Sequence, residues 1–167
     1  NEIHFARNRL GLEPEKLKQI LSFIENNNNK NFKIIQLTNE ELAFNPLNIN
    51  MTINTLLKIE KLEEVNLSGN VFGTNIENMK ILALGLREMK NLIKLGLGFN
   101  SLHLNLEENL SQLVFGLEGN KSIKTLSLDG NGFKSFNKNF KILVENCNVS
   151  NINFLFNKFN EEAKIEF

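Results

Sequence analysis

Apolar residues recur along the chain in a fixed pattern that ends on asparagine. The clearest copy has Ile123, Leu126 and Leu128 at its first, fourth and sixth positions and Asn131 at its ninth. Comparable copies start at Phe32, Leu62, Leu92 and Val149, and an incomplete copy includes Ile3, Phe5 and Asn8. The ninth positions fall at residues 8, 40, 70, 100, 131 and 157, so the steps between copies are 32, 30, 30, 31 and 26 residues. This near-constant period predicts a solenoid of stacked repeats.

Each copy begins with apolar and polar residues in alternation, which predicts a short strand with one buried face. We expect strands near residues 2–6, 34–38, 64–68, 94–98, 125–129 and 151–155. The period then changes to that of a helix, as at Leu17, Leu21 and Ile24, which predicts a helix over residues 14–26 with Pro14 in its first turn. Each repeat is therefore expected to contain a strand, a turn and a helix.

The starts of the later helices are marked by capping residues. Asn45 can cap a helix whose first residue is Pro46, and this helix is expected to end near Lys61. Two further starts have capping-box spacing, namely Thr74 with Glu77 and Asn105 with Glu108. In the fifth repeat the expected inward residues are Phe136, Phe140, Leu143 and Val144. The Asn run at 26–29 is interpreted as a solvated connector, and residues 161–167 as the start of another helix.

The composition excludes several classes of protein. Lys plus Arg and Asp plus Glu are both 19, and neither sign forms a long block, so a nucleic-acid-binding surface is not indicated. No apolar run approaches the roughly 18 residues that a membrane span requires. The single cysteine, Cys147, cannot form an internal disulfide and fits a reducing compartment, so we expect a cytoplasmic (intracellular) protein.

We expect residues 1–167 to form a single repeat domain. Neither end carries a polar capping repeat, which the exposed ends of a solenoid normally need. The domain is therefore predicted to be a segment of a longer array, or to have its ends covered by other chains. In the alternative, Phe159 and Ile165 fold back and close the last repeat.

The stretch 117–131 resembles the leucine-rich repeats of intracellular proteins, because it contains a helix end, an asparagine, a strand and a second asparagine in that order. The repeat length of about 30 residues resembles that of the ribonuclease-inhibitor class. This resemblance implies an α/β fold, a right-handed solenoid of about six strand-turn-helix repeats. It also implies a parallel sheet on the concave face, helices on the convex face, and a role in binding proteins. Glu40 departs from the pattern because it replaces the expected asparagine.

The asparagines at the ninth positions are expected to be structural. An amide has both donors and an acceptor, so it can pair backbone groups of an adjacent turn that would otherwise be buried without partners. The predicted ladder consists of Asn8, Asn70, Asn100, Asn131 and Asn157. Glu40 has no amide donor, so we expect its turn to be partly wet or differently shaped.

Function is expected among the residues that alternate with the inward apolar ones and point to the concave face. Phe99 and Phe156 occupy the same column two repeats apart, and Gly130 between them would leave a hollow beside Leu155. Exposed apolar groups often mark binding sites. The hypothesis is a protein-binding surface formed by Phe99, Leu155 and Phe156, with Lys94 and Asp129 nearby. In the alternative, both phenylalanines belong to the core, or a further repeat covers Leu155 and Phe156.

Signatures of catalysis, cofactors and metals are weak. Gly96 and Gly98 lack the third glycine of a dinucleotide loop, because Ser101 stands in its place. The stretch after Asp129 begins like a calcium loop, but Phe133 and Phe140 occupy positions that need oxygen ligands. His4, His103 and Cys147 have no partners at the spacing of a catalytic triad or zinc site. We expect no enzyme, no cofactor and no metal.

Three functional classes remain open. The first is a non-catalytic scaffold that binds a partner protein of unknown identity. The second is a regulator of a small GTPase or of actin assembly, although Arg7 is the only arginine on the predicted concave face. The third is a structural subunit of a large assembly.

Overall fold

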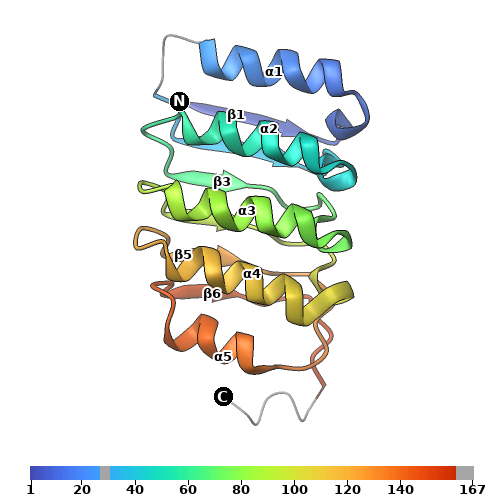
Figure 1. Ribbon diagram of the computed structural model, residues 1–167, viewed down its shortest axis with the longest axis vertical. Coiled ribbons are helices and arrows are strands. Elements are labelled where there is room, and N and C mark those ends of the chain that lie inside the picture. The colour runs from blue at the N-terminus through green and yellow to red at the C-terminus, as the bar shows by residue number, and fades with distance from the viewer. Residues whose placement is uncertain (27–30, 161–167) are drawn as a thin grey trace.

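The computed structural model describes residues 1–26 and 31–160, which form a stack of strand-and-helix turns (Figure 1). The strands are Glu2–Ala6 (β1), Ile34–Thr38 (β2), Glu64–Asn66 (β3), Lys94–Gly96 (β4), Thr125–Ser127 (β5) and Asn151–Asn153 (β6). The α-helices are Pro14–Asn26 (α1), Pro46–Leu57 (α2), Ile76–Glu88 (α3), Leu106–Glu118 (α4) and Lys138–Glu145 (α5). Short 3₁₀ turns precede the first four helices at Leu10–Leu12, Leu42–Phe44, Phe72–Thr74 and Leu102–Asn105.

The six strands form one parallel sheet in the order β1 to β6, and each strand pairs with the next in the same register. Val65 thus lies opposite Ile35 on one side and Leu95 on the other. The helices form a second layer that covers one face of this sheet (Figure 1). We call the open side of the sheet the strand face and the outer side of the helical layer the helix face. The predicted stack of parallel α/β repeats is confirmed.

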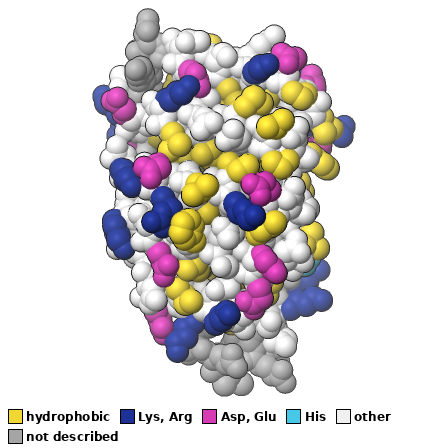
Figure 2. Space-filling view, viewed as in Figure 1, with side chains coloured by type: hydrophobic (Ala, Val, Ile, Leu, Met, Phe, Trp, Pro, Cys, Tyr) yellow, Lys and Arg dark blue, Asp and Glu magenta, His cyan; other side chains and the backbone are white. Residues whose placement is uncertain are grey.

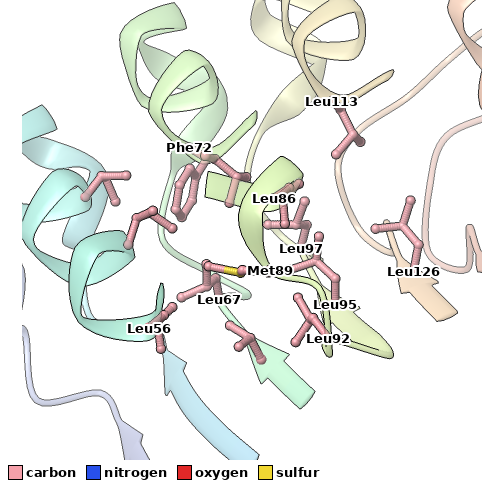
Figure 3. Packing of buried hydrophobic residues seen from close by; sticks show 14 of the residues in the cluster. Leu56, Leu67, Phe72, Leu86, Met89, Leu92, Leu95, Leu97, Leu113 and Leu126 are labelled. Carbon is pink, nitrogen blue, oxygen red and sulfur yellow. The ribbon is translucent and has the colours of Figure 1, made fainter. Parts of the chain in front are cut away.

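The core lies between these two layers. Leu67, Leu97 and Leu128 are each at most 1% exposed, because the sixth position of every repeat points from the sheet toward the helices. Figure 3 shows leucines from strands and helices filling the space between the layers around Phe72 and Met89. Each turn buries its apolar residues against its neighbours, as expected of a solenoid.

Several predicted boundaries were wrong by a few residues. Strands β3 to β6 end two residues before the predicted limits, although the hydrogen bonding continues: the amide of Gly69 donates to the carbonyl of Gly98. Helix α2 ends at Leu57 instead of near Lys61, because the amides of Lys58 and Ile59 bond three residues back and tighten the chain into a turn.

The structure confirms one of the predicted helix caps and corrects two. Asn45 accepts a hydrogen bond from the amide of Leu47 and Pro46 opens α2, as predicted. In α3 the cap is Asn75 and not Thr74, because the 3₁₀ turn moves the start of the helix by one residue. Asn105 makes no side-chain cap, since its amide donates to the carbonyl of Gly73 in the previous turn.

The last repeat is closed by aromatic side chains. Phe159 stacks on Phe136 with ring centroids 4.2 Å apart, and both contact Phe140 and Phe154. Phe159 therefore folds back onto the stack, as the alternative for this end predicted. Ile165, the helix expected at 161–167 and most of the Asn run at 26–29 lie outside the described residues. Val144, expected to point inward, is 42% exposed.

Candidate protein-binding surface

The ninth-position asparagines bridge successive turns. Asn100 is fully buried; its Oδ1 accepts from the amides of Asn70 at 2.8 Å and Phe72 at 3.4 Å, and its Nδ2 donates to the carbonyl of Leu67 at 3.0 Å. Asn70 and Asn131 make equivalent bonds. Asn157 donates to the carbonyl of Leu128 and accepts from the amide of Phe133. These side chains pair buried backbone groups and present no free chemistry to a ligand.

Glu40 occupies the same position in a different chemical form. It is fully buried, and its carboxylate accepts from the amides of Asn8 and Leu10 and from the side chain of Asn8. The turn was expected to be partly wet or differently shaped; at this position the carboxylate takes over the acceptor role of the amide and is itself buried. Asn8 itself is exposed, and its side chain donates to Glu40 and to the carbonyl of Ala6.

A second set of buried asparagines was missed from the sequence. Asn48, Asn78, Asn109 and Asn139 lie in the first turns of their helices and donate to backbone carbonyls of the preceding repeat. A signal was present, since these residues recur at steps of 30, 31 and 30. Adjacent repeats are therefore hydrogen-bonded both where the strand ends and where the helix begins.

The eighth position of each repeat lies beside the ladder, on the exposed rim of the strand face. All six residues here have a left-handed backbone, with φ between 54° and 73°; they are Arg7, Asn39, Gly69, Phe99, Gly130 and Phe156. A bulky non-glycine residue with positive φ is an outlier that costs free energy. Phe99 is nevertheless 52% exposed and Phe156 is 78% exposed, so neither is held in place by burial in the core.

The two phenylalanines come together across the intervening glycine. The ring of Phe99 lies over Gly130, where an added Cβ would be 2.3 Å from the ring. The ring centroids of Phe99 and Phe156 are 6.5 Å apart and tilted by 30°. The expected hollow at Gly130 is therefore occupied by Phe99. With Leu155, which is 64% exposed, these rings form what we call the aromatic patch.

The two charged residues predicted nearby have different locations. Asp129 accepts a hydrogen bond from the hydroxyl of Ser127, and its carboxylate covers Gly98, the residue before Phe99. Lys94 pairs with Glu64 at 3.3 Å and lies at the other end of its strand, five residues and about 16 Å from Phe99. The structure thus places Asp129 beside the aromatic patch and Lys94 away from it.

Comparison with known proteins agrees with this architecture. No family model and no curated protein matches the sequence. Among solved structures, the chain is similar to the leucine-rich repeat-containing protein LegL7 from Legionella pneumophila, with a TM-score of 0.64 and 26% identity over 90% of the present chain. The chain has the leucine-rich-repeat fold. It spans 45% of the length of LegL7, so it corresponds to about half of that structure.

Within residues 1–26 and 31–160, the titratable side chains do not come together in a cluster that could hold a metal or activate a nucleophile. Burial raises the pKa of the Cys147 thiol to about 11, which keeps it protonated and poorly nucleophilic. His103 Nδ1 donates to the carbonyl of Asn131, and His4 donates to Glu2, whose carboxylate raises the pKa of His4. Among the described residues, no three His, Cys, Asp or Glu side chains are placed to hold a metal. None of the helices in that part of the chain is long and apolar enough to cross a membrane.

Proposed function

We propose that this leucine-rich-repeat domain is a non-catalytic scaffold that binds a partner protein on its strand face, with the aromatic patch as the anchor. One observation carries the proposal: Phe99 and Phe156 are large and exposed at backbone positions that favour glycine or asparagine. Strained residues that the core does not require are found at functional sites more often than elsewhere. Exposed aromatic side chains are also the groups that most often anchor protein interfaces.

Two further observations support a binding role. The leucine-rich-repeat fold typically serves as a protein-binding scaffold, and the strand face presents one continuous sheet. Asp129 beside the aromatic patch supplies a carboxylate that can fix the orientation of a partner. We place the protein in the cytoplasm, since its single cysteine is buried and serves packing.

Replacement of Phe99 by glycine tests the proposal. We expect capture of the partner from the source cell to fall at least tenfold, because hot-spot aromatics contribute about 2 kcal/mol or more to binding. The free energy of unfolding should change by less than about 1 kcal/mol, because relief of the left-handed backbone offsets the lost ring contact. Quantitative capture and urea denaturation of the same preparations measure the two effects.

Phe23→Ala is the matched control, since Phe23 is 58% exposed on α1, away from the strand face. This variant should keep both the partner and the stability of the parent chain. A Phe99→Gly protein that retains its partner but unfolds much more easily would show that the ring serves folding, and the proposed anchor would then be wrong.

A further inference from the structure

Asp129 differs from the other carboxylates on the strand face. At the third, fifth, seventh and eighth positions of the repeats, the described residues include three carboxylates, Glu2, Glu64 and Asp129. Glu2 pairs with His4 at 2.9 Å, and Glu64 pairs with Lys94 at 3.3 Å. Asp129 makes no ion pair with any residue in the described part of the chain. It is therefore a carboxylate on a proposed binding surface whose charge the chain itself does not balance.

One oxygen of this carboxylate is held in place and the other is open. The hydroxyl of Ser127 donates to Oδ1 of Asp129 and accepts from the side-chain amide of Asn153 at 3.3 Å. Oδ2 has no hydrogen-bond donor among residues 1–26 and 31–160, and Asp129 is only half-buried. The carboxylate is thus fixed in orientation and can accept a charge-assisted hydrogen bond from another molecule.

The same carboxylate lies beside the aromatic patch. The amide of Phe99 donates to the carbonyl of Asp129 at 2.8 Å, so the two residues are adjacent on neighbouring repeats. The side chain of Asp129 lies over Gly98, the residue before Phe99, and the ring of Phe99 lies over Gly130, the residue after Asp129. Each side chain therefore reaches across to the repeat of the other. The open oxygen and the exposed ring form one site.

The helix face shows how this chain balances an exposed ring with its own cation. Acidic and basic side chains are interspersed on that face (Figure 2). Arg87 on α3 places its guanidinium carbon 4.4 Å from the centroid of the Phe115 ring on α4. A cation over an aromatic face is attracted by the ring, and arginine makes this contact more often than lysine. Phe99 is 52% exposed, and no equivalent cation lies over its ring among the described residues.

We propose that Asp129 and the aromatic patch bind an arginine side chain of the partner protein; this inference rests on the function proposed above. The planar guanidinium donates to Oδ2 of Asp129 with its edge and covers the ring of Phe99 with its face. Leu155 contacts the aliphatic part of the arginine, which packs well on apolar groups. A lysine ammonium can pair with the carboxylate, but it has no flat face to stack on the ring.

Titration of the isotope-labelled 167-residue chain with a blocked peptide, acetyl-Gly-Ser-Arg-Ser-Gly-amide, tests the arginine site by NMR. The amide signals of Gly98, Phe99 and Gly130 should shift and saturate, with a dissociation constant on the order of 1 to 10 mM. A peptide with citrulline, whose side chain is neutral, should bind at least about fivefold more weakly, because it lacks the charge. A lysine peptide should bind about threefold more weakly than the arginine peptide.

Asp129→Asn is the decisive variant, because it keeps the size of the side chain and an acceptor for Ser127. It should weaken binding of the arginine peptide at least about fivefold, and its midpoint in urea should match that of the parent chain. Glu88→Gln is the matched control, since Glu88 is an exposed carboxylate at the end of α3. This control should bind the arginine peptide as the parent chain does.

Three results would each overturn the arginine site. They are unshifted signals at the aromatic patch, equal binding of the arginine and citrulline peptides, and undiminished binding by Asp129→Asn. The capture experiment with Phe99→Gly is a separate measurement. If that variant loses its partner while the peptide leaves the patch unshifted, the proposed function stands and the arginine site is wrong. If the variant keeps its partner, the proposed anchor is wrong, and a partner arginine at this site is wrong with it.

Discussion

The eighth and ninth positions of each repeat are one residue apart in sequence but have opposite environments. From the second to the fifth repeat the ninth is buried and polar, and at Asn70, Asn100 and Asn131 its hydrogen bonds join successive turns. The eighth is largely exposed, and its occupants range from glycine to phenylalanine on a left-handed backbone. The fold thus determines the residue type where the backbone needs a partner. It leaves the adjacent position free for contact with other molecules.

The largest loss of stability is expected at the ninth position. Asn100→Ala leaves the amides of Asn70 and Phe72 and the carbonyl of Leu67 without this partner in the core. Each buried group costs on the order of 1 kcal/mol or more, so the free energy of unfolding should fall by about 3 kcal/mol, as measured by urea denaturation. Asn50→Ala, on the exposed side of α2, should change it by less than about 0.5 kcal/mol. Equal effects of the two variants would contradict a structural ladder.

A smaller loss is expected from Glu40→Ala. The variant removes the acceptor for the amides of Asn8 and Leu10, but Asn8 is exposed and its amide can bond to water instead. We expect a cost of about 2 kcal/mol, below that of Asn100→Ala. Hydrogen exchange at Leu10 provides a local measure, since its amide should lose protection. A cost above that of Asn100→Ala would mean that the carboxylate does more than replace the amide acceptor.

The smallest of the three effects is expected at the eighth position. Gly130→Ala places a methyl group on a residue with φ of 61° and against the ring of Phe99. The left-handed backbone costs about 1 kcal/mol, and displacement of the ring adds to it. When Phe99→Ala is added, the cost of displacing the ring should disappear, whereas the cost of the left-handed backbone remains. A double-mutant cycle measures the difference as a coupling energy. Strict additivity would show that the ring does not lie over Gly130 in solution.

The sequence predicts the stack well because the repeat imposes it. Residues such as Leu95, Leu97 and Asn100 can satisfy their apolar and polar groups only if each strand lies beside its equivalent in the next turn. The period and the type of residue therefore determine the sheet and its register. The start of α2 was predicted correctly because Pro46 marks it, although a 3₁₀ turn precedes it. The start of α3 has no proline, and local spacing alone does not distinguish Asn75 from Thr74.

The candidate site is less predictable from sequence. Position in the repeat indicates that Phe99 and Phe156 share a column, but the direction of the Phe99 ring over Gly130 depends on side-chain packing. Lys94 opens β4 and Phe99 lies beyond the end of that strand, so the intervening chain separates the two side chains. The exposure of Val144 was also missed, because this residue satisfies the helical period of the inward positions.

The two sets of buried asparagines hold each turn to its predecessor at two separate edges. Under a pulling force applied to the two ends of the chain, the outermost turn has a neighbour on one side only and should detach first. Once the asparagine hydrogen bonds of this turn are broken, the next turn also has a neighbour on one side only and should detach next. Because equivalent residues are 30 or 31 positions apart, the molecule would extend in steps of about 10 nm.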